Sequence, residues 1–279
     1  LIGRFGGTFW DPWLDDNGDA VGHSPLFLGD DGYFAATMII GVPGEPPSLG
    51  EGAPNPQVFT DCYDRNGGAS ILGYPINNVH RWGNGYIQDL RGGQGYEGAI
   101  MQPDGEARAY AVYGSIWSRY LTLGGAEGPL GYPLNDESPL PLSSISSAEC
   151  LYNKFHGGSV VHHATGAQAG LTVFLGHGIF NKWEELSYGG GILGLSSSDE
   201  RKAPQSGAGG FDTTGVVCDF EGGHLHWHRT GALANHAFET HGAIDSVYMQ
   251  MGGSDSWLGF PVKDEYNNAF GYPQSDFEG

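Results

Sequence analysis

Two hydrophobic periods alternate along the chain. His224-Leu225-His226-Trp227-His228 alternates polar and apolar residues, and Ser159-Val160-Val161-His162 does so in part. Because side chains alternate across a strand, this period of two predicts half-buried strands. Further on, Ile244, Tyr248 and Met251 stand at i, i+4 and i+7, which places them on one face of a short helix. The pattern therefore predicts strands followed by short helices.

Glycine marks the turns between these elements. Thr230-Gly231-Ala232 separates the first strand from a second one expected over residues 232–238, so the pair predicts a hairpin. Gly252-Gly253 follows the helix, where a left-handed cap is expected. Each unit is thus expected to consist of a β-hairpin and one short helix.

The same order of elements recurs along the chain. The helical face returns as Ile179, Trp183 and Leu186 before Gly189, and as Ile116, Tyr120 and Leu123 before Gly124. A tetrapeptide Leu-Gly-aromatic-Pro stands at residues 72–75, 130–133 and 258–261, with a decayed copy at 193–196 and a candidate first copy at 40–43. Such self-similarity indicates a unit that buries its apolar face against its neighbours. We therefore expect Trp183, Tyr120 and Tyr248 in the core. Leu258, Phe260 and Ile244 are expected to be buried with Tyr248, and Leu130, Tyr132 and Ile116 with Tyr120.

Five repeats account for nearly all of the chain. We place them at residues 1–48, 49–85, 86–141, 142–204 and 205–279, in a single domain. The first two tetrapeptides are 32 residues apart, whereas the later intervals are 58, 63 and 65 residues. The second repeat is therefore expected to have lost most of its hairpin.

The two ends of the chain occupy the same place in the repeat. Phe5-Gly6-Gly7 and Asp276-Phe277-Glu278-Gly279 both match the Phe-x-Gly-Gly segments that begin at Phe155 and Phe220. A terminal strand from each end is expected to pair, which would remove exposed sheet edges. The predicted fold is a β-rich repeat protein closed into a five-repeat toroid, similar to a propeller.

A pair of acidic residues follows three of the tetrapeptides, as Asp136-Glu137, Asp199-Glu200 and Asp264-Glu265. These carboxylates are expected to accept hydrogen bonds from loop amides. They also suggest a glycosidase acid and base, but a catalytic pair need occur only once, and these pairs recur with the repeat.

The tetrapeptides, the Phe-x-Gly-Gly segments and the acidic pairs together resemble the LGFP repeat family, over nearly the whole chain. Such repeats occur in actinobacterial cell-surface proteins, appended to mycoloyltransferases and peptidoglycan amidases, and in some secreted fungal proteins. The resemblance implies a non-catalytic module that binds surface polysaccharide. It also implies an extracellular location, secreted or associated with the cell wall. It carries no residue-level site.

The charge of the chain limits its partners. Twelve Lys and Arg against 32 Asp and Glu give a net charge of −20. A surface this acidic repels phosphate backbones and anionic lipid, so nucleic acid is not an expected partner. No stretch approaches the ~20 apolar residues of a membrane span, so membrane insertion is not expected either. The chain starts at Leu1 without a signal-like segment, and we expect a leader that was removed or is not covered.

The three cysteines leave two alternatives open. Cys150 and Cys218 lie five and two residues before the Phe of their Phe-x-Gly-Gly segments. Neighbouring repeats either bring them together in a disulfide and leave Cys62 free, or bury all three as thiols.

Histidines are the candidate metal ligands. His163 and His228 stand at the same repeat position, eight residues after the Phe, and His226 lies on the same strand face as His228. We expect His163 and His228 to face solvent or the interior of the ring, where they would be the first ligands of a divalent metal. Same-face positions on a strand are about 7 Å apart, so two of them seldom hold one ion alone. The alternative is a polar exposed face.

Aromatic residues outside the helical core face are the candidate sugar-binding residues. They are Trp10, Trp13, Trp82, Trp117 and Phe180. The chain carries no Gly-x-Ser-x-Gly, His-Glu-x-x-His, Walker or dinucleotide motif. We therefore expect a non-catalytic carbohydrate-binding or cell-wall-binding module with multivalent shallow sites and no cofactor beyond the candidate metal. The alternatives are a self-assembling structural ring protein and a cell-wall hydrolase.

Overall fold

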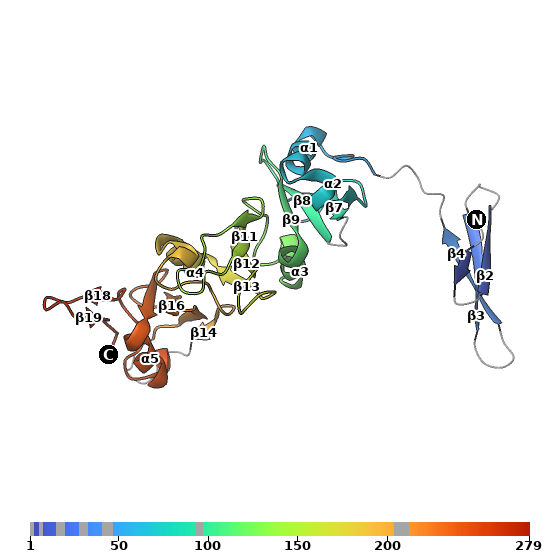
Figure 1. The fold of residues 1–279 in the computed structure, drawn as a ribbon. Coiled ribbons are helices and arrows are strands. Elements are labelled where there is room, and N and C mark those ends of the chain that lie inside the picture. The colour runs from blue at the N-terminus through green and yellow to red at the C-terminus, as the bar shows by residue number, and fades with distance from the viewer. Residues whose placement is uncertain are drawn as a thin grey trace. The chain divides into compact units, whose positions relative to one another are not determined.

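The chain divides into two compact units, Leu1–Ser48 and Leu49–Gly279. The computed structural model describes residues 3–5, 8–14, 20–27, 33–40, 47–92, 97–203 and 212–279, with side chains from residue 47 onward (Figure 1). The division falls at the boundary that we placed between the first and second repeats. The single-domain organisation stays a prediction.

The first unit contains one antiparallel sheet. Its four strands follow chain order: β1 (Gly3–Phe5), β2 (Thr8–Leu14), β3 (Ala20–Phe27) and β4 (Tyr33–Ile40). The candidate first tetrapeptide begins at Ile40, which ends β4, and its residues 41–43 lie outside the described part of the chain.

The second unit begins with helices instead of a hairpin. Helix α1 (Pro56–Arg65) starts with proline, whose fixed φ suits the first helical turn, and it buries Val58, Phe59 and Cys62. The short α2 (Gly68–Ile71) leads directly into the tetrapeptide, whose last two residues form β5 (Tyr74–Pro75). This segment has the helix of a repeat without its hairpin, as expected for the second repeat.

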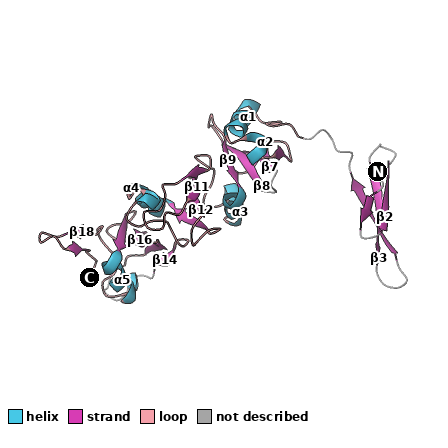
Figure 2. Ribbon diagram, viewed as in Figure 1, coloured by secondary structure: helices cyan, strands magenta, loops and turns pink. Residues whose placement is uncertain are grey.

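Three fuller repeats follow, each a sheet and then a helix (Figure 2). The first contains β6 (His80–Arg81), β7 (Gly85–Arg91), β8 (Glu97–Pro103), β9 (Tyr110–Tyr113), α3 (Gly114–Thr122) and η1 (Gly125–Glu127). The second contains β10 (Ser138–Pro139), β11 (Cys150–Phe155), β12 (Gly158–His163), β13 (Thr172–Gly176), α4 (His177–Glu185) and η2 (Tyr188–Gly190). The third contains β14 (Arg201–Ala203), β15 (Gly215–Asp219), β16 (Gly223–His228), β17 (Ala237–His241), α5 (Gly242–Gln250) and η3 (Gly253–Asp255). A two-stranded pair, β18 (Tyr266–Asn267) and β19 (Pro273–Gln274), ends the chain.

The predicted strands at β12 and β16, the three predicted helices and the predicted hairpin are confirmed, because β16 pairs antiparallel with β17 across Thr230-Gly231-Ala232. A second and tighter turn, which was not predicted, lies at Phe-x-Gly-Gly, where Phe155 pairs with Gly158. The strand expected over residues 232–238 begins only at Ala237. Strand β15 was missed because its residues are buried on both faces, so its apolar run does not alternate. Strand β11 was missed because apolar and polar residues do not alternate along its sequence, Cys-Leu-Tyr-Asn-Lys-Phe.

Two successive residues with positive φ follow each of the helices α1, α3, α4 and α5. Gly252 and Gly253 adopt φ of 108° and 58°, as the left-handed cap predicted. In the second full repeat the same conformation falls on Ser187 and Tyr188, with φ of 71° and 52°, and not on Gly189. The backbone of the repeat thus imposes this turn even where glycine is absent.

The tetrapeptides form the joint after each helix. Their glycines have closely similar φ values: Gly73 at 73°, Gly131 at 65°, Gly194 at 66° and Gly259 at 68°. The carbonyl of this glycine accepts a hydrogen bond from a helix aromatic 11 residues earlier: Tyr120 Oη to Gly131 (2.8 Å), Trp183 Nε1 to Gly194 (3.0 Å) and Tyr248 Oη to Gly259 (2.7 Å). The decayed copy therefore has the same geometry as the full ones.

The cores lie between successive repeats. Ile116 and Tyr120 of α3 are buried with Phe155 and Val160 of the next repeat. Ile179 and Trp183 of α4 are likewise buried with Phe220 and Leu225. Each helix thus depends on the following sheet for its cover, as repeat architectures require.

The last repeat departs from the predicted burial. Tyr248 and Phe260 are buried, as are Leu130, Tyr132, Tyr120 and Ile116 in the earlier repeat, which confirms that part of the prediction. Ile244 and Leu258, however, are only half-buried. The physical reason is that, in the described part of the chain, no counterpart of β12 or β16 packs on α5.

The β-rich repeat is therefore shown, but ring closure is not. Among the described strands each sheet is an open antiparallel set, β1 pairs with β2, and the C-terminal Phe277 bridges to Pro261 of its own repeat. The closed five-repeat toroid stays a prediction. Cys62, Cys150 and Cys218 are all buried free thiols, which decides between the two alternatives for the cysteines.

Candidate functional site

The candidate metal ligands lie in the core. His163, His226 and His228 each expose only 1% of their surface, so the expectation that His163 and His228 face solvent or a ring interior is wrong. His163 Nε2 lies 2.8 Å from the carbonyl oxygen of Ser196, and His228 Nε2 lies 2.8 Å from that of Pro261. The equivalent histidines thus bind the last residue of a tetrapeptide.

No metal site emerges from these histidines. Among the residues from 47 onward that the structure describes, no group of three His, Cys, Asp or Glu could hold a metal ion. Burial lowers the pKa of His226 to about 3, so this ring stays neutral, and its Nε2 lies 3.2 Å from Thr240 Oγ1. The period of two correctly placed His226 and His228 on one face of β16, but that face is buried.

Two of the candidate aromatics are buried and two lie outside the described side chains. Phe180 exposes 1% of its surface and Trp117 exposes 5%, so the expectation that they are exposed is wrong. Trp117 of α3 and Phe180 of α4 stand at equivalent helix positions. Each side chain packs in the core between its helix and the sheet of the next repeat. Trp10 and Trp13 belong to β2, in the part of the chain whose side chains are not described.

Trp82 is different, because it is half-buried and lines a groove of about 370 Å³. We call this the Trp82 groove. It is lined by Ile76, His80, Arg81, Trp82, Ile87, Asp89, Leu90, Glu97, Gly98, Trp117 and Leu121. Two of the five predicted aromatics, Trp82 and Trp117, therefore meet in one hollow.

Neighbouring backbone fixes the position of the Trp82 ring. A Cβ added at Gly125 would lie 2.1 Å from Trp82 Cη2, so the ring lies against η1 where only glycine leaves room. Tyr132 Oη donates to the Trp82 carbonyl at 2.5 Å, and the ring centroid lies 6.3 Å from that of Trp117 in an edge-to-face arrangement. The aromatic surface is thus held rigidly before any ligand arrives.

Charged side chains surround this aromatic surface. His80 and Glu97 are exposed, and Asp89 is half-buried. Arg81 forms an ion pair with Asp104, with Nη1 and Oδ1 2.5 Å apart, and lies over the Tyr86 ring at 4.7 Å. A half-buried aromatic ring with acceptors and donors at its rim is suited to a ligand with both an apolar face and hydroxyl groups.

The Trp82 groove is not repeated. Trp82 stands ten residues after the first residue of its tetrapeptide, and the equivalent positions hold Leu140, Ala203 and Asn268. Leu140 and Ala203 are buried. The expectation of multivalent shallow sites therefore finds no support at this position.

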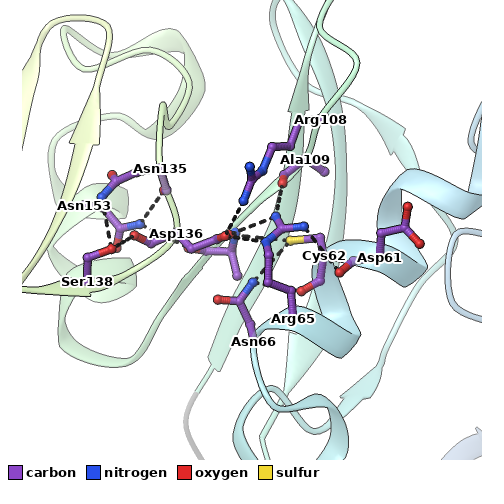
Figure 3. Close-up of polar contacts among 11 residues, drawn as sticks. Asp61, Cys62, Arg65, Asn66, Arg108, Ala109, Asn135, Asp136, Ser138 and Asn153 are labelled. Atoms are coloured by element: carbon purple, nitrogen blue, oxygen red, sulfur yellow. Dashed lines mark hydrogen bonds and ion pairs between the residues drawn. The ribbon is translucent and has the colours of Figure 1, made fainter.

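The acidic pairs join neighbouring repeats (Figure 3). Asp136 accepts from the amide of Ala111 at 2.9 Å and from Arg65 Nε of α1 at 2.7 Å, with Arg108 Nη2 at 3.6 Å. Burial alone would raise the pKa of Asp136, but the bonds from Arg65 and the amide outweigh it and lower the pKa. Burial raises the pKa of the adjacent Cys62 thiol, so it does not supply a thiolate nucleophile.

The next two repeats use the same arrangement. Asp199 accepts from the amide of Phe174 at 2.7 Å and pairs with Arg119 of α3. Asp264 accepts from the amide of Glu239 at 3.1 Å and pairs with Lys182 of α4, Nζ to Oδ2 2.6 Å. The predicted bonds to backbone amides are confirmed, although the amides belong to strands. Each Asp also binds a cation on a helix of the preceding repeat.

The glutamates of two of these pairs, Glu137 and Glu200, lie in similar environments. Burial raises the pKa of Glu137 to about 7, despite a hydrogen bond from Tyr113 that lowers it. Burial likewise raises the pKa of Glu200, which accepts from the amide of Gly176 at 3.0 Å. Burial thus raises the pKa of equivalent glutamates in two repeats. The raised pKa is therefore a property of the joint between repeats and does not mark one catalytic centre.

A polar cluster around His224 was missed from the sequence. His224 Nδ1 lies 2.8 Å from Asp245 Oδ1, and its Nε2 lies 3.1 Å from Asp219 Oδ1. Burial alone would lower the pKa of His224, but the two carboxylates outweigh it and raise the pKa to about 9. The sequence signal that could have revealed this cluster is Asp245. It stands at the helix position that Trp117 occupies in α3 and Phe180 in α4.

Comparison with known proteins adds no relative. No protein-family model matches the chain, and a search of curated proteins finds no match. The resemblance to the LGFP repeat family therefore rests on the motifs of the sequence and stays a prediction.

Proposed function

We propose that this protein binds polysaccharide without cleaving it, and that the Trp82 groove is a binding site. The observation that supports this most is the rigidly held Trp82 ring, half-buried in a hollow with Trp117 and the carboxylates of Asp89 and Glu97. The C–H face of a sugar ring packs on an aromatic ring, while carboxylates and imidazole nitrogens take its hydroxyl groups.

The charge of the chain favours neutral glycans within this proposal. A net charge of −20 repels polyanions such as teichoic acids or nucleic acid at long range. Helices in the described part of the chain are all too short or too polar to cross a bilayer. We propose attachment to a cell wall or an extracellular glycan, as the resemblance to LGFP repeats implies.

The contacts that the acidic pairs make within the fold support binding without catalysis. Asp136, Asp199 and Asp264 each accept a strand amide and pair with a helix cation, which leaves them committed to joining repeats. A hydrolase, the less favoured alternative, would need one such pair to act on substrate. A self-assembling structural protein would instead give defined oligomers that do not retain glycan.

Retention on insoluble wall preparations and on neutral polysaccharides tests the proposal. We expect Trp82→Ala to weaken binding by about tenfold or more, a loss of ~1.4 kcal/mol, because it removes the central aromatic surface. Trp257→Ala is the matched control, since Trp257 is an exposed tryptophan outside the groove. Free monosaccharide should compete poorly with the polymer.

Three outcomes would contradict the proposal. They are equal retention of the Trp82→Ala and Trp257→Ala variants, absence of retention on every wall and glycan tested, and release of reducing ends that Asp136→Asn abolishes. The first outcome would show that the glycan-binding site lies outside the Trp82 groove. The second would favour the structural alternative, and the third the hydrolase.

A further inference from the structure

A second hollow, of about 630 Å³, adjoins the Trp82 groove. We call it the α3 groove. Its lining includes Glu97, Ser115, Ser118, Arg119, Thr122 and Thr172. Glu97 lines the Trp82 groove as well, so the two hollows meet at this residue.

Helix α3 contributes one row of side chains to each hollow. Trp117 and Leu121 line the Trp82 groove, whereas Ser118 and Thr122 line the α3 groove. Residues four apart are neighbours on a helix surface, so each pair forms a row along α3. The second row follows the first by one residue, and the two hollows therefore flank the same helix with different chemistry, one aromatic and one rich in hydroxyl groups.

Glu97, where the hollows meet, has no counterpart with a side chain in the next two repeats. It precedes Gly98, which pairs with Tyr113, the residue before α3. The equivalent residues are Gly157 and Gly222. A Cβ at Gly157 would lie 1.8 Å from a backbone carbonyl oxygen, and one at Gly222 would lie 2.7 Å from another. Of the three fuller repeats, only the one that contains α3 therefore places a carboxylate here.

The carboxylate of Glu97 is available to a ligand. Its side chain is exposed, and Arg91 Nη2 lies 3.9 Å from Glu97 Oε1 with both side chains open to solvent. Exposed ion pairs of this kind contribute little, so a ligand hydroxyl can replace the contact with Arg91 at small cost.

The hydroxyl groups of the α3 groove are also able to accept hydrogen bonds. Ser118 Oγ donates to the Gly114 carbonyl at 3.1 Å, and Thr122 Oγ1 donates to the Arg119 carbonyl at 2.7 Å. A hydroxyl that donates its proton keeps lone pairs that accept. Because Ser118 and Thr122 are exposed, their oxygens form a row of acceptors for the hydroxyl groups of a sugar chain.

The charges of the two hollows favour a neutral ligand. Among the described residues that line them, Arg81 pairs with Asp104 and Arg119 pairs with Asp199. Both guanidinium groups thus already hold a carboxylate of the protein. The carboxylate or phosphate of an anionic sugar would have to displace one of these partners and would also meet Glu97.

We propose that the Trp82 groove and the α3 groove are two subsites of one site, which binds a neutral glycan chain longer than a disaccharide. This rests on the function proposed above for the Trp82 groove. One sugar ring packs on Trp82, the chain passes Glu97, and the following units bind Ser118 and Thr122. Ligand pockets have volumes of about 300–1,000 Å³, so each hollow has room for a ligand of its own and a chain that fills both must be longer.

A series of fragments of increasing length tests the proposal. The neutral polysaccharide that retains the full chain most strongly is cut by partial acid hydrolysis, and its fragments are separated from monosaccharide to hexasaccharide. Each fragment is titrated into the full chain by calorimetry. We expect the affinity to rise by about tenfold or more between the disaccharide and the longest fragments, because contacts in the second subsite add to those in the first.

A variant on α3 locates the second subsite. Ser118→Leu fills part of the α3 groove and removes one acceptor, so it should weaken binding of the longest fragments by about tenfold and leave the disaccharide unchanged. Ser246→Leu is the matched control, because Ser246 is the equivalent residue of α5, is exposed, and donates to the Gly242 carbonyl at 2.9 Å. It should change neither affinity. Trp82→Ala should weaken binding of both fragments.

The failure of this inference is distinct from the failure of the proposed function. An affinity that stops rising at the disaccharide, equal affinities of Ser118→Leu and Ser246→Leu for the longest fragments, or an equal loss for Ser118→Leu on short and long fragments would overturn the two-subsite proposal. If Trp82→Ala still weakened retention, the Trp82 groove would remain the glycan site. Retention that Trp82→Ala leaves unchanged, or no retention on any glycan, would overturn both proposals.

Discussion

At the residue scale, histidine has a structural role in this protein. His163 and His228 occupy equivalent positions and each places Nε2 at 2.8 Å from a tetrapeptide carbonyl. A buried carbonyl without a partner is costly, so a neutral imidazole that donates to it stabilises the joint. The same residue type that suggested a metal therefore serves the repeat.

His224 gives the first prediction, on stability against pH. Its folded pKa of about 9 lies above the unfolded value of about 6.5, so the charged ring stabilises the fold. This stability is fully present below about pH 6.5 and is lost as the pH rises through about 9. We expect His224→Gln to lower the free energy of unfolding by at most about 3 kcal/mol at pH 6, and by much less at pH 10.

Urea denaturation at the two pH values measures this difference. His236→Gln, which removes an exposed imidazole, corrects for general effects of pH. A loss for His224→Gln that is the same at pH 6 and pH 10 would show that the contacts with Asp219 and Asp245 do not depend on its charge.

Tyr120 gives the second prediction. Its buried hydroxyl donates to the Gly131 carbonyl at 2.8 Å, and Tyr120→Phe leaves that carbonyl without this donor. The free energy of unfolding should fall by about 1–3 kcal/mol. Tyr74→Phe, at an exposed tyrosine, should change it by less than about 0.5 kcal/mol. Equal effects of the two changes in thermal denaturation would contradict the role of the helix aromatic.

At the element scale, the glycine of the tetrapeptide sets the direction of the chain after each helix. Gly73 and Gly131 have nearly equal φ values of 73° and 65°, yet their surroundings differ. A Cβ at Gly131 would meet only His156 Cβ at 3.6 Å, whereas one at Gly73 would lie 1.8 Å from the Arg91 carbonyl oxygen. The two sites therefore separate backbone strain from steric exclusion.

These glycines give the third prediction. Gly131→Ala should cost about 1–2 kcal/mol of stability, the penalty of a left-handed residue with a Cβ. Gly73→Ala carries the same strain and also forces the strand of Arg91 away, so it should cost clearly more. The comparison is made by urea denaturation of both variants. Equal losses would mean that the backbone at Gly73 relaxes without cost.

At the scale of the whole second unit, a recurring ion pair connects repeats. Asp136, Asp199 and Asp264 each bind a cation on a helix of the preceding repeat. Neighbouring repeats are thus tied by a charged contact as well as by the apolar core between them. Exposed pairs of this kind contribute little, but Asp136 is largely buried and also accepts a backbone amide.

Asp136 gives the fourth prediction. Asp136→Ala should lower stability by about 2–4 kcal/mol at pH 7, because it leaves Arg65 and the Ala111 amide without their acceptor. Since the folded pKa of Asp136 is lowered, this contribution is present above the unfolded pKa and is lost as the pH falls through the folded value. Asp61→Ala, at an exposed carboxylate of α1, is the matched control. A difference between the variants that persists unchanged in strong acid would contradict this account.

The sequence by itself determined the repeating unit, because the period of its apolar residues and the place of its glycines are local properties. The strands at β12 and β16, the three helices and the glycine joints follow from that pattern. Strand β15 was not predictable, since burial on both faces removes the alternation that reveals a strand.

Only the tertiary structure decided which faces are covered. Periodicity places His163 and Phe180 on particular faces, but contacts with segments distant in the sequence decide that both are buried. Ile244 and Leu258 are half-buried, because no counterpart of β12 or β16 packs on α5 in the described part of the chain. The Trp82 groove likewise depends on Gly125 and Trp117, 43 and 35 residues away in sequence. Burial is set by contacts between distant segments, which a local pattern does not contain.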